Sequence, residues 1–159
     1  MRKPGKFALS GVLPAIAAIL IAAALVGAAA SPHKGLATLS FGLLSLGLFQ
    51  RKVRSTHATL MVAGIVLDLA LVVLLQISRD AIHTAVGPTL NDLQRIHVGA
   101  STAATFLYLP VLFLGAANLF QRGGSVVRRW HVRLAIPAYA FRAIGFIFMF
   151  FVPGGHVTH

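Results

Sequence analysis

Long apolar stretches separated by short, mostly basic segments form the dominant pattern of this chain. A helix that crosses a bilayer needs about 20 mainly apolar residues. The pattern predicts five helices, at about residues 7–30, 35–50, 56–78, 96–120 and 130–152. The stretch 35–50 is short, and it can extend back through Pro32, because proline suits the first turn of a helix. We therefore predict a single all-α domain over 1–159, a polytopic transmembrane bundle of five helices.

The composition supports this class. The chain is 57% hydrophobic and 11% charged, with a mean hydropathy of +0.84, whereas a soluble domain would be about one quarter charged. We therefore expect the lipid bilayer to be its main partner. The absence of cysteine excludes disulfides, thiolate metal sites and iron–sulfur clusters made by this chain. The net charge of +11 is divided into short clusters between apolar runs, which indicates membrane topology and no nucleic-acid partner.

The basic residues also predict an orientation, because membrane proteins concentrate Lys and Arg on the cytoplasmic side. One set of connections holds Arg2, Lys3, Lys6, Arg51, Lys52, Arg54, Arg122, Arg128, Arg129 and Arg133, and the opposite set holds Lys34, Arg79 and Arg95. We predict a cytoplasmic N-terminus and an external C-terminus in a bacterial inner membrane. The helix at 7–30 is longer than the apolar core of a secretion signal, so we expect it to be retained; the alternative is cleavage near Ala30.

Two of the predicted helices share an arrangement of ionisable residues. Asp68 follows His57 by eleven residues, and Arg142 follows His131 by eleven residues. Eleven residues rise about 16 Å, so Asp68 and Arg142 should lie at one depth near the middle of the membrane. An unpaired charge there is costly, and we predict a structural ion pair between them that also brings His57 close to His131. The alternative is a protonated Asp68, with Arg142 contacting headgroups or a partner subunit.

Two histidines at one end of a bundle suggest a cofactor site. Imidazoles from facing helices can be the axial ligands of a b-type haem, and basic side chains such as Arg133 could hold its propionates. Alternatively, His57 and Met61 lie on one helix face and form, with His131, a metal site of the imidazole and thioether type that suits copper(I). The third interpretation is that both histidines are ordinary interfacial side chains.

The opposite side of the predicted bundle carries five more histidines, His33, His83, His97, His156 and His159. His97 begins a helix and could ligate a second haem together with His83, whereas the last two could bind a metal or belong to a polar tail. We predict no catalytic residues, because the chain has no glutamate and no phosphate-binding glycine loop. The sequence therefore favours a non-enzymatic protein.

From "HATLM" onward the sequence resembles a small family of bacterial membrane proteins of unassigned domain function, some of which are linked to assembly of haem–copper cytochrome oxidase. The likeness rests on His57 with Met61, on His97 in "RIHVGAS" and on His131 in "HVRLAIPAYAF". The resemblance as a whole begins at Gly42, ahead of the first of these motifs. The resemblance implies an accessory role and a cofactor site at His57, His97 and His131. A looser likeness is to small b-type cytochromes.

Three functions are compatible with these observations. The first is a non-enzymatic accessory or assembly protein of a respiratory redox complex, which binds haem or copper. The second is an electron-transfer subunit of the b-type cytochrome class. The third is a purely structural membrane subunit of a larger complex, which the eleven phenylalanines and short loops favour. In the first two the expected partner is a larger membrane redox complex.

Overall fold

The computed structural model describes residues 31–79, 90–120 and 124–151, together with Ile21 and Leu25. The segments 31–79, 90–120 and 124–151 form four helices and, within the described residues, no strand: α2 Pro32–Phe49, α3 Arg54–Arg79, α5 Asp92–Leu119 and α6 Ser125–Met149. These helices match the predictions for 35–50, 56–78, 96–120 and 130–152 with shifted ends. The predicted helix at 7–30 lies outside the described residues apart from those two positions.

The shifted helix starts have local causes. Helix α2 begins with Pro32 after an extended Ser31, as expected for proline at a first helical turn. Helix α5 begins with a capping box, in which Asn91 Oδ1 accepts from Gln94 N over 2.8 Å and Gln94 Oε1 accepts from Asn91 N over 2.9 Å. These polar residues precede the apolar run, so an expectation based on hydrophobicity alone placed this start too late.

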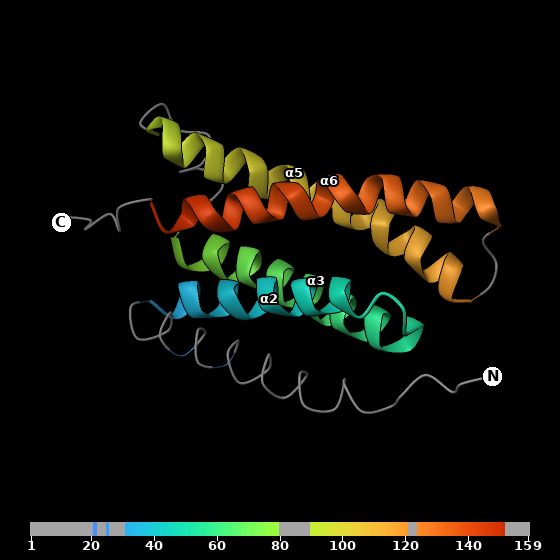
Figure 1. The fold of residues 1–159 in the computed structure, drawn as a ribbon. Coiled ribbons are helices and arrows are strands. Elements are labelled where there is room, and N and C mark those ends of the chain that lie inside the picture. Colours follow the sequence, from blue (N-terminus) through green and yellow to red (C-terminus); the bar gives the residue numbers. More distant parts are fainter. Residues whose placement is uncertain (1–20, 22–24, 26–30, 80–89, 121–123, 152–159) are drawn as a thin grey trace.

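The helices form two antiparallel hairpins, α2–α3 and α5–α6. Figure 1 shows the hairpins side by side, with the turn between α2 and α3 and the start of α6 at the same end of the molecule. Most contacts between helices lie within the hairpins, and α2 with α6 and α3 with α5 make the contacts between them. The bundle is therefore two tight pairs joined by a thinner interface.

The two hairpins are an internal repeat. In the first helices, "HKGLAT" from His33 and "HVGAST" from His97 share His, Gly and Thr at equal spacing. In the second helices, "HATLMVAGIVLD" from His57 and "HVRLAIPAYAFR" from His131 share the His, a Leu and a final ionisable residue. The same registers match further positions: Ser40 with Ala104, Leu44 with Tyr108, and Gly47 with Val111, all of them buried. The bundle thus has an approximate twofold relation between its halves.

The core lies where the hairpins meet. Leu44, Ile65, Ala104 and Tyr108 are almost fully buried and pack with Met61, Leu69, Leu112 and Tyr139. Glycines let the helices approach within each hairpin: a Cβ at Gly64 would lie 2.9 Å from the side chain of Leu44, and a Cβ at Gly145 would lie 2.5 Å from Ser101 Oγ. Close approach at small residues is the usual way in which membrane helices pack.

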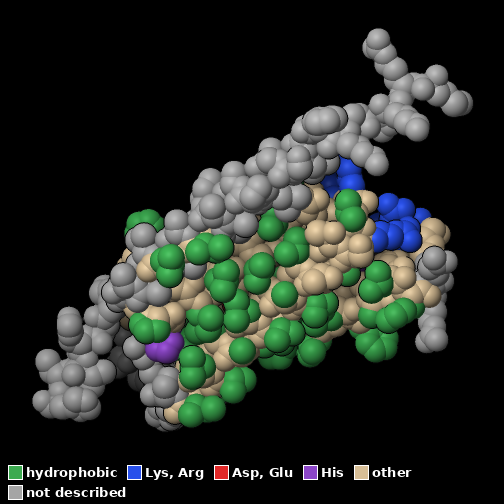
Figure 2. All heavy atoms as spheres, turned by 90° about the horizontal axis from the view of Figure 1, so that it is seen from below, with side chains coloured by type: hydrophobic (Ala, Val, Ile, Leu, Met, Phe, Trp, Pro, Cys, Tyr) green, Lys and Arg blue, Asp and Glu red, His purple; other side chains and the backbone are tan. Residues whose placement is uncertain are grey.

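The outer surface has the character of a membrane protein. Helices α3, α5 and α6 are long and apolar enough to cross a membrane. Figure 2 shows apolar side chains scattered along the length of one face and Lys and Arg side chains gathered at one end. That end includes six exposed cations in the α2–α3 turn and the first turns of α6: Arg51, Lys52, Arg54, Arg128, Arg129 and Arg133. A surface of this kind fits contact with a lipid bilayer.

Candidate functional site

A buried ion pair joins the two hairpins at the middle of the bundle. Arg142 Nη2 lies 2.6 Å from Asp68 Oδ1, and the two side chains are 5% and 8% exposed. Tyr108 of α5 donates its hydroxyl to Asp68 Oδ2 over 2.8 Å. The predicted pair is thus present, and Asp68 receives a donor from each helix of the second hairpin. Such partners are what a charge in a low-dielectric interior requires.

The side chain of His57, in α3, is hydrogen-bonded to the C-terminal turn of α2. Its Nδ1 lies 2.7 Å from the carbonyl oxygen of Gly47, which belongs to the last helical turn, where carbonyls lack partners within the helix. A carbonyl oxygen only accepts, so this contact places the proton on Nδ1 and leaves the lone pair of the neutral ring on Nε2. A histidine whose Nδ1 is fixed in this way is prepared to ligate a metal through Nε2.

His131 has the equivalent arrangement in the second hairpin. Its Nδ1 lies 3.1 Å from the carbonyl oxygen of Val111 in α5, and Val111 is the repeat counterpart of Gly47. Gly115 leaves room for the ring, because a Cβ there would lie 3.2 Å from His131 Cε1. Each hairpin therefore holds one imidazole against its own first helix, with Nε2 as the remaining nitrogen.

The structure brings His57, Met61 and His131 into one region. His57 and His131 are close enough to interact electrostatically. Met61 lies one turn after His57, and a Cβ at Gly47 would lie 2.9 Å from its sulfur, so His57 and Met61 both contact Gly47. The six exposed cations lie at the same end. Among the described residues no group of three or more His, Asp or Glu side chains is arranged around a common point, so a metal here would depend on Met61 or on added ligands.

His97 lies apart from these residues. It occupies the start of α5, at the opposite end of the bundle from His57 (Figure 1). Its Nδ1 lies 2.7 Å from the carbonyl oxygen of Gly145, and it is close enough to Arg142 to interact electrostatically. The three histidines predicted to bind a cofactor therefore do not form one site. His57 and His131, called the inner histidines below, lie near one end of the bundle. His97 lies near the opposite end.

The remaining predicted histidines contribute less to the site. His83, His156 and His159 lie outside the described residues. His33, the repeat counterpart of His97, is in the first turn of α2, and its buried Nδ1 has no hydrogen-bond partner in the part of the chain that the structure describes. The described structure therefore gives no pairing of His97 with His83.

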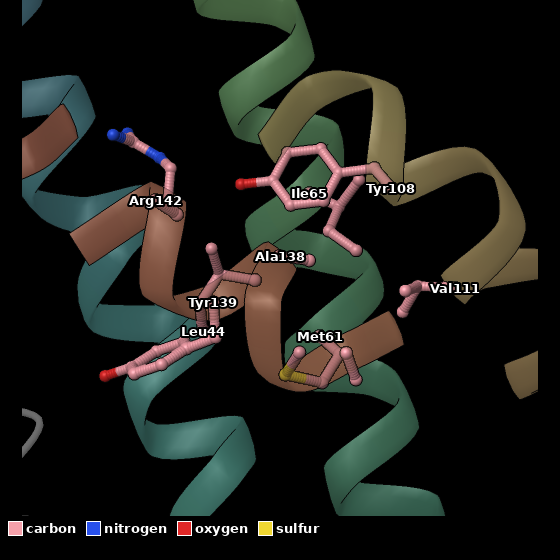
Figure 3. Close-up of a pocket in the computed structure, with 9 residues that line it drawn as sticks. Leu44, Met61, Ile65, Tyr108, Val111, Ala138, Tyr139 and Arg142 are labelled. Atoms are coloured by element: carbon pink, nitrogen blue, oxygen red, sulfur yellow. The ribbon is translucent and has the colours of Figure 1, made fainter. Parts of the chain in front are cut away.

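A small cavity lies between the ion pair and the inner histidines. Its volume is about 20 Å³, and it is lined by Leu44, Met61, Ile65, Tyr108, Val111, Ala135, Ala138, Tyr139 and Arg142 (Figure 3). This space suits about one water molecule, whereas pockets for organic ligands measure several hundred Å³. A porphyrin does not fit into this cavity, so a haem would have to lie at the end of the bundle beside His57 and His131.

Several functional contacts were not predicted from the sequence. Tyr108 was read as part of an apolar run, although a buried phenol needs a hydrogen-bond partner. An alignment of the two hairpins draws attention to Tyr108, because a polar phenol stands there at the position of the apolar Leu44. The carbonyl acceptors Gly47 and Val111 have no sequence signal, since every residue carries a carbonyl group.

The chain matches no protein-family model, no curated protein and no solved structure. Any functional conclusion therefore rests on the residues and the geometry described above.

Proposed function

We propose that this chain is a non-enzymatic accessory or assembly protein of a respiratory redox complex in the bacterial inner membrane. In this proposal His57 and His131 hold a redox-active metal group, haem or copper, at the cytoplasmic end of the bundle. The observation that carries the proposal is the matched pair of imidazoles. Each donates from Nδ1 to a main-chain carbonyl, which leaves Nε2 for a ligand.

The surroundings of the pair support a membrane redox site. The apolar surfaces of α3, α5 and α6 suit a bilayer, and by the positive-inside rule the six exposed cations support the proposal that their end of the bundle is cytoplasmic. This orientation puts the N-terminus in the cytoplasm and the C-terminus outside. The link to oxidase assembly is supported by the resemblance of the sequence around His57, His97 and His131 to that family.

Haem is the first candidate ligand. Two imidazoles from different hairpins are a suitable donor set for the two axial positions, and Arg128, Arg129 and Arg133 could neutralise propionates. A bound haem would supply one-electron chemistry. With haem as a permanent cofactor, the protein would be the b-type cytochrome subunit that forms the second candidate function.

Copper is the second candidate ligand, and a separate observation favours it. Met61 and His57 meet at Gly47, and imidazole with thioether suits copper(I). A single ion also needs far less room than a porphyrin. Bound copper would supply one-electron transfer or metal delivery to a partner.

The first experiment is an absorption spectrum, reduced minus oxidised, of the full chain purified in mild detergent, with iron and copper measured on the same sample. A b-type spectrum with stoichiometric iron supports haem, and stoichiometric copper without that spectrum supports copper. If neither metal is retained after purification and neither binds on addition of haem or copper(I), the cofactor proposal is wrong and the purely structural role takes its place.

Matched variants locate the site. His57→Ala and His131→Ala should each lower the bound metal at least tenfold, because a second-shell change alone costs 10–100-fold in affinity. His97→Ala is the control at the other end of the bundle and should retain the metal. Met61→Leu should lower copper binding but leave haem binding unchanged, and Met149→Leu is its control. Equal loss in His97→Ala and His131→Ala would contradict the assignment.

The accessory role is tested in the host membrane. His57→Ala and His131→Ala should lower oxidase activity and the haem content of the oxidase, while the variant proteins themselves accumulate normally. Unchanged oxidase in both variants would remove the link to assembly. That result would leave the metal-binding measurements on the purified chain to decide between the remaining roles.

A further inference from the structure

One exposed face of α6 changes from basic to apolar along the helix. Exposed residues three or four positions apart share this side of α6, and we call them the outer face: Val126, Arg129, Arg133, Ile136, Ala140, Ile144 and Ile147. Its two arginines lie near the start of the helix, and only apolar residues follow them. His131 lies on the opposite side of the same helix, so the outer face is separate from the inner histidines.

Trp130 flanks the two arginines of the outer face. Its side chain is 50% exposed, and the guanidinium carbon of Arg133 lies 5.5 Å from the centre of its ring, which is a cation–π contact. In membrane proteins an exposed tryptophan sits at the level of the lipid headgroups. This contact therefore places the guanidinium of Arg133 at the depth of the lipid phosphates.

The arginines of the outer face have no acidic partner among the described residues. The whole chain contains three acidic residues. Asp68 is paired with Arg142 in the interior, Asp92 begins α5 at the other end of the bundle, and Asp80 lies outside the described residues. The other four exposed cations at this end add to the same positive potential. The surface is therefore complementary to an anion from outside the chain.

We propose that the outer face of α6 binds an anionic phospholipid, with its phosphate between Arg129 and Arg133 and its acyl chains along the apolar residues that follow. Side chains four residues apart on a helix are neighbours, so both guanidiniums reach one phosphate. Arginine holds phosphate through charge-assisted hydrogen bonds. The proposal does not rest on a metal or haem at the inner histidines. It requires only that this end of the bundle lie at a membrane surface.

The test uses Trp130, which is the single tryptophan of the chain. The full chain is reconstituted into vesicles of equal parts phosphatidylglycerol and phosphatidylcholine, with bromine on the acyl chains of one lipid or of the other. Bromine quenches tryptophan fluorescence on contact, and the charge of the membrane is the same in both series. We expect stronger quenching by brominated phosphatidylglycerol, equivalent to an about fivefold preference, as one cation at an anionic surface provides. Equal quenching by the two lipids would overturn the proposal.

Matched double variants locate the lipid site. Arg129→Gln with Arg133→Gln should abolish the preference for phosphatidylglycerol. Arg51→Gln with Arg54→Gln removes two exposed cations from the same end of the other hairpin and should retain most of the preference. Equal loss in the two double variants would overturn the assignment to α6, because the attraction would then belong to the basic end as a whole.

Inorganic phosphate tests the other source of a phosphate group. Added in place of chloride at equal ionic strength, it should leave the preference for phosphatidylglycerol unchanged, because a free ion lacks the acyl chains that the apolar residues contact. Loss of the preference in phosphate alone would overturn the proposal, since the arginines would then bind a soluble phosphate ion.

Discussion

The two hairpins share one plan but differ at many positions, and three of these differences lie where the hairpins meet. In each, a histidine near the start of the second helix donates to a carbonyl of the first. The acid Asp68 stands opposite the base Arg142 in the alignment. Likewise the thioether of Met61 corresponds to the methyl group of Ala135, and the alkyl side chain of Leu44 corresponds to the phenol of Tyr108. Equivalent positions thus carry complementary groups where the halves face each other.

The opposite charges of Asp68 and Arg142 explain why the first hairpin pairs with the second and not with a copy of itself. Two copies of the first hairpin would bring two Asp68 carboxyls together, and two copies of the second would bring two Arg142 guanidiniums together. Like charges in a low-dielectric interior are strongly unfavourable, so a single acid and a single base specify the observed pairing. A repeat with a charge difference therefore gives an asymmetric bundle from similar parts.

The largest expected effect comes from breaking this charge complementarity. Asp68→Asn or Arg142→Gln should each lower the free energy of unfolding by about 3–5 kcal/mol, because the remaining charge is buried without a partner. The exchanged variant, Asp68→Arg with Arg142→Asp, should recover much of the loss. It should not recover all, because Tyr108 would no longer face the carboxylate. Denaturant unfolding in mild detergent measures the free energy of unfolding of the two single variants and of the exchanged variant.

The control for this series is Arg128→Gln, which removes an exposed charge and should change stability by less than about 0.5 kcal/mol. If the single and exchanged variants unfold at the same denaturant concentration, the two side chains do not stabilise the interface as a pair. The comparison of the hairpins would then rest on packing alone.

The phenol that distinguishes the second hairpin has the next largest effect. Tyr108→Phe removes a hydrogen bond to a buried carboxylate and should cost about 1.5–3 kcal/mol, as expected for bonds to charged groups. Tyr139→Phe is the matched variant, since its hydroxyl is hydrogen-bonded to the neutral Ser45 over 2.9 Å, and should cost about 0.5–1.5 kcal/mol. The same unfolding assay compares them. Equal costs would mean that the charge of Asp68 adds nothing at Tyr108.

The sequence predicts most of this fold, because apolar runs of sufficient length mark membrane helices. The observed starts of α5 and α6 lie before the predicted ones because each helix begins with a segment that mixes polar and apolar residues. The polar ones are Asn91, Asp92 and Gln94 in α5, and Ser125, Arg128 and Arg129 in α6. Caps and basic first turns are dictated by hydrogen bonding and by headgroups, and a hydropathy pattern does not contain that information.

The site was predictable only where burial forces a partner. Asp68 and Arg142 could be paired from the sequence because a charge inside an apolar run needs an opposite charge. The phenol of Tyr108 is compatible with apolar surroundings, so nothing in the pattern required it to point at Asp68. The placement of His57 and His131 against main-chain carbonyls depends on how the helices of each hairpin pack, which follows from the glycines at the contacts and not from the histidines.

An effect slightly smaller than that of Tyr108 comes from the glycine that sets the packing of the second hairpin. In Gly145→Ala the new Cβ would lie 2.5 Å from Ser101 Oγ and 3.3 Å from Ser101 N. The serine hydroxyl would have to move away and the two helices would have to shift slightly apart, so stability should fall by about 1–3 kcal/mol. Gly99→Ala is the control on the partner helix: nothing lies within 4 Å of its Cβ, and it should gain up to about 1 kcal/mol from helix propensity. Opposite signs in the unfolding assay would show that α5 and α6 are held close by Gly145. Equal small effects would mean that the helices can separate at this contact without loss, and the second hairpin would then be looser than its contacts indicate.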